Sequence, residues 1–222
     1  MWADLLPILL AMMISPARTL ALIILLHTPR SVATALAYVA GMVVAMLVQG
    51  GGLGAAMSMV GLTADDRSGD LGVVVGALFL VGGVILLAGA FKMATAPAAG
   101  SGSLGSVLQR LEHVGPSAAF KVGFGWIFAS PKQWVFALTA VAVIFAADLQ
   151  PIASLANYAL FTLLVQAVYF VIAGAYLVWQ ARVDPLLDAV FGWIRANLKP
   201  TAVGLFAVFG VVFVAKGLTA LN

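Results

Sequence analysis

The stretch Ile-Ser-Pro-Ala-Arg-Thr, residues 14–19, lies in the middle of the first apolar segment. A related stretch, Ala-Ser-Pro-Lys-Gln-Trp at residues 129–134, lies in the middle of the fourth. Proline lacks a backbone N–H, so a helix bends or breaks where it occurs. Irregular backbone persists in lipid only where protein or a water-filled cavity covers it. The two stretches therefore predict two broken membrane helices that meet at an internal site.

Composition supports a membrane protein. The chain has 222 residues, of which 64% are hydrophobic and 9% are charged, whereas soluble domains carry about 25% charged residues. Eleven Lys and Arg against eight Asp and Glu are too small an excess to indicate nucleic-acid binding. The absence of cysteine excludes disulfides and thiolate metal sites.

Six apolar segments are long enough to cross the roughly 30 Å of a bilayer core. The expected spans are residues 5–26, 33–60, 71–91, 120–147, 155–179 and 201–220. In the second span, small residues at four-residue spacing (33, 37, 41 and 45) predict close helix packing. The sequence Gln-Gly-Gly-Gly at 49–52 either breaks this span or marks its end.

Two connections between spans have the pattern of amphipathic helices. One is residues 103–112, within the linker 94–117. The other is residues 184–198, where Asp184-Pro185 gives an N-cap followed by proline. Each is either a connector beneath the bundle or a gating element.

The order of the segments predicts an all-α fold with an internal repeat. Three spans in residues 1–93 and three in residues 118–222 enter the membrane in opposite directions. This is the inverted repeat of many secondary transporters, whose sites lie where broken helices meet. Seven Lys and Arg lie in the first, third and fifth connections and two lie on the opposite side. The positive-inside rule thus predicts that both termini are extracytoplasmic.

The polar groups within the spans favour binding over catalysis. No carboxylate lies well inside a span, the two histidines are far apart, and neither mid-span serine has an activating base. We therefore expect no enzyme activity, metal or cofactor. The candidate substrate-binding residues are Ser15, Pro16, Arg18, Thr19, Gln49, Ser130, Pro131, Lys132, Gln133, Gln166 and Tyr169.

These groups, with the positive ends of two half-helices, would suit an anionic or strongly polar head group. A competing interpretation is that Arg18 and Lys132 snorkel to an interface or bond carbonyls of the broken helices.

The motifs also resemble those of a known family. Residues 15–18, 27–30 and 37–41 look like the start of the GAP (Sap) family, and residues 130–133 resemble its fourth-span motif, usually Asn-Pro-Lys. Here Ser130 replaces the asparagine. This family is a branch of the lysine-exporter (LysE) superfamily. The resemblance implies an inner-membrane protein that moves glycolipids of the actinobacterial cell envelope outward, alone or beside a larger lipid transporter. It also implies that the proline motifs belong to the substrate path.

Our hypothesis is a homodimeric transporter that exports or flips an anionic or glycosylated lipid. Arg18 and Lys132 would hold the head group. One alternative is a LysE-type exporter of small solutes such as amino acids. Another is a non-transporting accessory of a larger lipid pump, which would act through the surfaces at 103–112 and 184–199.

Overall fold

The first and fourth expected spans are bent helix pairs in the computed structural model, which describes residues 1–28, 31–59, 70–95, 111 and 114–221. Helix α1 (Trp2–Met13) meets α2 (Pro16–Leu26) at 53°, and α6 (Pro116–Phe128) meets α7 (Pro131–Phe145) at 71°. Both bends fall at the Ser-Pro pairs, which confirms that helices 1 and 4 are broken there.

Helix α3 (Ser31–Met59) runs through the glycines at 50–52 without interruption. The sequence suggested a break or a helix end there, and both suggestions are wrong. Inside lipid, a helix that opens loses backbone hydrogen bonds that no water replaces, and this cost exceeds the weak helix propensity of glycine. Helix α4 (Asp70–Thr95) follows. The amphipathic helix expected at 103–112 lies outside the described residues except for Leu111.

Helix α8 (Pro151–Leu221) is 71 residues long, and its backbone is non-helical at Trp179 and Asn197. These two turns divide it into a first section (151–178), a middle section (180–196) and a last section (198–221). The middle section starts after Trp179 and contains Asp184 within a helical turn, so the N-cap expected at Asp184 is wrong. Pro185 and Pro200, which cannot donate backbone hydrogen bonds, follow the two turns.

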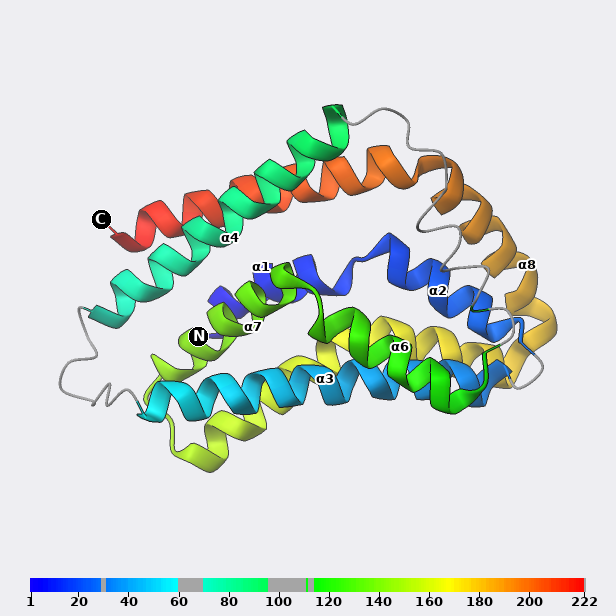
Figure 1. Ribbon diagram of the computed structural model, residues 1–222, viewed down its shortest axis with the longest axis horizontal. Helices are drawn as coiled ribbons and strands as arrows, with labels where there is room; N and C mark the ends of the chain where they lie inside the picture. The colour runs from blue at the N-terminus through cyan, green and yellow to red at the C-terminus, as the bar shows by residue number, and fades with distance from the viewer. Residues whose placement is uncertain (29–30, 60–69, 96–110, 112–113, 222) are drawn as a thin grey trace.

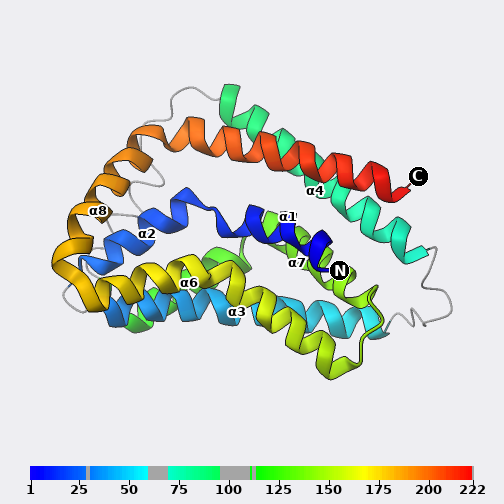
Figure 2. The ribbon, with the colours of Figure 1, turned by 180° about the vertical axis from the view of Figure 1, so that it is seen from behind.

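The helices form two layers (Figures 1 and 2). In one layer α4 packs against the last section of α8, with Gly83 close to the Gly210 carbonyl and Gly217 close to the Gly76 carbonyl. The other layer holds α3, α6, α2 and the first section of α8. The α1 and α7 helices lie between the layers, and both termini lie at one end of the molecule (Figure 1).

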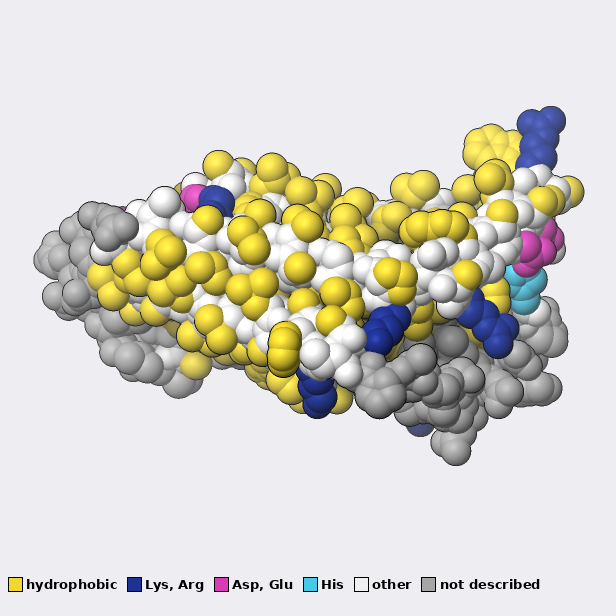
Figure 3. Space-filling view, turned by 90° about the horizontal axis from the view of Figure 1, so that it is seen from above, with side chains coloured by type: hydrophobic (Ala, Val, Ile, Leu, Met, Phe, Trp, Pro, Cys, Tyr) yellow, Lys and Arg dark blue, Asp and Glu magenta, His cyan; other side chains and the backbone are white. Residues whose placement is uncertain are grey.

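Three helices, α3, α4 and α8, are long and apolar enough to cross a membrane, and each bent pair adds one such span, which gives up to five among the described residues. The chain is therefore a membrane protein by length and composition of its helices. Large hydrophobic side chains are exposed on most of them. In Figure 3 hydrophobic side chains cover much of the visible face, and most basic ones lie in the half away from the chain ends.

Candidate functional site

Both helix breaks have the same local construction. Ile14 and Ser15 are extended between α1 and α2, and Ser130 is extended (φ −86°, ψ 113°) between α6 and α7. In each break a serine takes the N-cap position, and the following proline is the first residue of the next helix. Proline is tolerated there because the first N–H of a helix has no partner inside the helix.

The carbonyls freed at the first break are bonded by two side chains. In an unbroken helix residue 16 would donate to the Met12 carbonyl, but a proline cannot. The Arg18 guanidinium donates to this carbonyl instead, and the Tyr169 hydroxyl donates to the Met13 carbonyl at 3.2 Å. Arg18 is 1% exposed, and its Cζ lies 5.4 Å from the centre of the Tyr169 ring. The interpretation that Arg18 bonds a carbonyl of the broken helix is therefore confirmed.

At the second break, too, side chains donate hydrogen bonds to the freed carbonyls. Pro131 cannot donate to the Ile127 carbonyl, and the amide Nε2 of Gln49 lies 3.4 Å from this oxygen and donates to it. The indole Nε1 of Trp134 donates to the Phe128 carbonyl at 2.7 Å. In each break, one side chain thus donates to the carbonyl four residues before the proline, and a second side chain donates to the next carbonyl along the chain.

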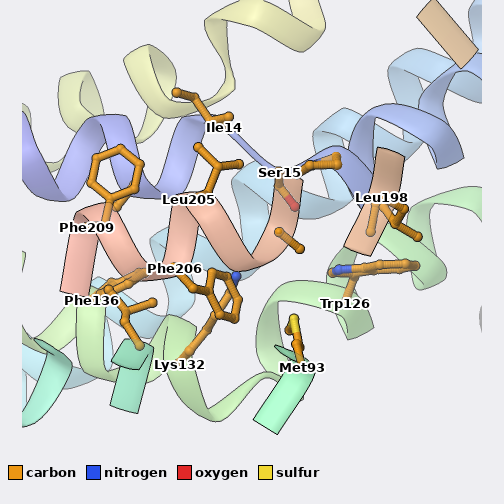
Figure 4. A pocket seen from close by; sticks show the side chains of 15 residues that line it. Ile14, Ser15, Met93, Trp126, Lys132, Phe136, Leu198, Leu205, Phe206 and Phe209 are labelled. Atoms are coloured by element: carbon orange, nitrogen blue, oxygen red, sulfur yellow. The ribbon is translucent and has the colours of Figure 1, made fainter. Parts of the chain in front are cut away.

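A cavity of about 220 Å³, which we call the break cavity, lies between the first break and the start of α7 (Figure 4). Ser15 and Pro16 contribute from the first break, and Lys132 contributes from the first turn of α7. Among the described lining residues Lys132 alone is charged, and its ammonium lies 4.7 Å from the centre of the Phe206 ring. The remaining described lining is apolar or aromatic and comes from α1, α2, α4, α6, α7 and the last section of α8. It includes Leu86, Trp126, Phe136 and Phe209.

The expected site residues are therefore divided between two roles. Ser15, Pro16 and Lys132 line the break cavity. Arg18 does not, and it supports the first break with Tyr169, while Gln49 supports the second. The other residues lie outside the cavity lining. Among them, Thr19 donates to the Ser15 carbonyl at 3.2 Å, Gln166 donates to the Met46 sulfur at 3.3 Å, Gln133 is 2% exposed, and Ser130 and Pro131 form the second break.

Sequence reasoning missed several residues of this site. Trp134, which bonds the Phe128 carbonyl, lies directly after Ser-Pro-Lys-Gln, and this position was a usable signal. Trp126 and Phe206 line the break cavity. Phe206 gave no signal, because one aromatic residue among many apolar ones does not reveal which helix face it occupies.

His27 lies apart from the break cavity, at the end of α2. Its Nε2 is 3.7 Å from an Asp184 carboxylate oxygen and 3.6 Å from one of Asp188, and its ring meets Tyr176 edge-on at 6.5 Å. The two aspartates lie on the middle section of α8 and Tyr176 on its first section, so His27 joins the end of α2 to both sections. Within the described ranges no group of three or more His, Asp or Glu residues could hold a metal ion.

The family model described as Sap, sulfolipid-1-addressing protein, matches residues 5–219. The chain belongs to this family. The match includes both breaks and every residue of the break cavity, and it confirms the resemblance found in the Ser-Pro motifs. No curated protein and no solved structure matches the chain. Placement of the Sap family member in the LysE superfamily stays a prediction.

Proposed function

We propose that this protein exports or flips a membrane lipid with an anionic or glycosylated head group, and that the break cavity binds this head group. The observation that carries the proposal is the position of Lys132, a cation in the first turn of α7. Apart from Ser15, the other described residues of the cavity lining are apolar or aromatic. In the described part of the chain, Lys132 forms no ion pair with a carboxylate. An anion would satisfy it, with the Ser15 hydroxyl as a second contact. The family's description, which names a sulfolipid, favours a sulfated head group.

The proposed transport architecture is the six-span inverted repeat. The contacts across the breaks support it, because the second helix of each half bonds the broken helix of the other half. Gln49 of α3 bonds α6, and Tyr169 of α8 bonds α1. The third helices of the halves, α4 and the last section of α8, pair through Gly83 and Gly210. The inner-membrane location, extracytoplasmic termini, homodimer and larger partner stay predictions.

A binding experiment tests the role of Lys132. We would reconstitute the purified protein in nanodiscs and measure binding of a sulfated galactosylceramide and of the unsulfated galactosylceramide. Loss of a charge-assisted bond worth about 1.5–3 kcal/mol should weaken binding of the sulfated lipid roughly ten- to hundredfold in Lys132→Gln. Lys121→Gln is the matched control, because Lys121 is an exposed lysine on α6 of the same bent pair.

The outcome separates the proposal from simpler lipid contact. Unchanged affinity for the sulfated lipid in Lys132→Gln would refute the assigned role. Equal loss for both lipids would mean that Lys132 shapes the cavity without binding the sulfate.

A second candidate function is export of a small solute. The break cavity, at about 220 Å³, is smaller than the roughly 300–1,000 Å³ of most sites for drug-sized ligands. A volume of this size matches an amino acid or a lipid head group alone. Transport of labelled amino acids into vesicles that contain the protein, with no effect on lipid distribution, would favour the small-solute exporter.

A further inference from the structure

A group of buried polar side chains lies on α3 and on the first section of α8, outside the lining of the break cavity. On α8 it consists of Tyr158, Thr162, Gln166 and Tyr169, and on α3 of Tyr38 and Gln49. We call these six residues the polar seam. Each is buried, with at most 5% exposure. The spacings of four, four and three residues on α8 put its members on one helix face.

Two seam residues of α8 contact α3 directly. The Tyr158 hydroxyl donates to the Met46 carbonyl at 3.1 Å, and the Gln166 amide donates to the Met46 sulfur at 3.3 Å. In Figures 1 and 2 α3 and the first section of α8 lie side by side. The α8 part of the seam therefore lies against α3. On the α3 side, Gln49 donates to the Ile127 carbonyl of α6, and the Tyr38 ring lies close to Gly123 of α6.

Most seam residues contribute a polar atom that has no hydrogen-bond partner among the residues that the structure describes. These atoms are Tyr38 Oη, Gln49 Oε1, Thr162 Oγ1 and Gln166 Oε1, and at the inner end Arg18 Nη1 joins them. An unsatisfied buried polar group costs about 1–3 kcal/mol, and more than about 90% of such groups in proteins are satisfied. Two further atoms of this kind, Gln133 Oε1 and Asp184 Oδ1, lie elsewhere in the fold. The five named here belong to helices that pack together, and they indicate a shared partner that can donate and accept hydrogen bonds.

The seam connects two defined features of the molecule. At one end Tyr158 forms part of the wall of a groove of about 720 Å³ between α3, the end of α7 and the start of α8, and Gly50, next to Gln49, lies in the same wall. At the other end Tyr169 lies against Arg18 at the first break. Eleven residues of helix between Tyr158 and Tyr169 span roughly 16 Å, about half of the hydrocarbon thickness of roughly 30 Å.

We propose that the polar seam binds a file of water molecules that connects this groove to Arg18. Water suits the seam because one molecule can satisfy two to four buried donors and acceptors. Arg18 forms no ion pair with a carboxylate among the described residues, and hydration through the seam stabilises its charge in the protein interior. The water file gives solvent a route to the first break that is separate from the break cavity and independent of the transported substrate.

Silver-ion accessibility tests the proposal, because the chain contains no cysteine and silver ions are small enough for a narrow file. We would compare Thr162→Cys with Thr139→Cys in nanodiscs and measure the loss of free thiol by mass spectrometry. Both threonines are fully buried, but the Thr139 hydroxyl donates to its own helix at Val135, 2.7 Å away. Silver should react on the order of tenfold or more faster with Thr162→Cys, because a dry buried thiol reacts only when the structure opens.

A second measurement uses the unaltered protein and so does not depend on the folding of a variant. Hydroxyl radicals made by pulsed radiolysis label buried side chains that contact water. Tyr38 and Tyr169 should be labelled, whereas Phe161 and Phe213, which are equally buried, should not. The proposal requires both results. Equal silver reaction rates for the two variants, or labelling of the tyrosines no faster than that of the phenylalanines, would overturn it.

Discussion

The contact between α3 and α6 leads to a quantitative prediction at two glycines. A side chain at Gly123 would overlap the backbone carbonyl of Tyr38, and one at Gly41 would overlap the carbonyl of Phe120. Small residues allow membrane helices to approach this closely. In the same helix as Gly123, Gly125 has no heavy atom within 4 Å of the position that a side chain would take. Gly125 is therefore a matched control for Gly123.

The expected free-energy changes have opposite signs. Gly123→Ala should cost about 1–3 kcal/mol from overpacking, at the upper end because a backbone carbonyl cannot rotate away. The better helix propensity of alanine returns up to about 1 kcal/mol, which leaves a net loss of about 2 kcal/mol. Gly125→Ala should gain only the stability that comes from the better helix propensity of alanine, up to about 1 kcal/mol. The two variants should then differ by about 3 kcal/mol, or roughly 6–12 °C in Tm at about 2–4 °C per kcal/mol for a chain of this size.

Thermal unfolding in detergent, followed by tryptophan fluorescence, measures this difference, since neither substitution alters a tryptophan. The melting temperature should be lowest for Gly123→Ala, intermediate for the wild type and highest for Gly125→Ala. Equal melting temperatures for the two variants would refute direct backbone contact between α3 and α6 at this position.

Two further predictions concern the groove and the second break. Gly50→Ala should lose about 1–3 kcal/mol, because the new methyl group would overlap the Tyr158 ring. Gly51→Ala, which meets no atom within 4 Å, should be at least as stable as the wild type in the same melt, and an equal loss in both variants would contradict the assigned contact. Trp134→Phe removes the donor to the Phe128 carbonyl and should lower stability by about 1 kcal/mol. Circular dichroism would measure the change without relying on tryptophan emission, and an unchanged melt would contradict a stabilising role for this bond.

The helix breaks could be predicted from sequence because their cause is local. Proline removes a donor at a fixed position in the chain, whatever surrounds it. The glycines at 50–52 gave a wrong prediction because the contact that explains a glycine there is with a distant part of the chain. Gly50 lies against Tyr158, more than a hundred residues later, so it provides room for a ring while the helix continues.

Asp184 is a similar case. Asp-Pro is a good helix start by itself, but the chain turns at Trp179 and Asp184 lies opposite His27 in a continuing helix. Contacts with α2 override the local signal. Neither these contacts nor the packing of Phe206 over Lys132 could be derived from periodicity, because the distance in sequence between the partners is large.

The two mid-span cations show why the residue type and its depth in the span were not enough to predict what each side chain does. Arg18 is the second residue after its proline, whereas Lys132 is the first after its own. One residue along a helix is a rotation of about 100°, so the two cations face different directions. The equivalent positions agree with this geometry, since Ala17 lines the break cavity as Lys132 does, and Gln133 is buried as Arg18 is. The register of each cation relative to its proline therefore separates a residue that supports the break from one that faces the cavity.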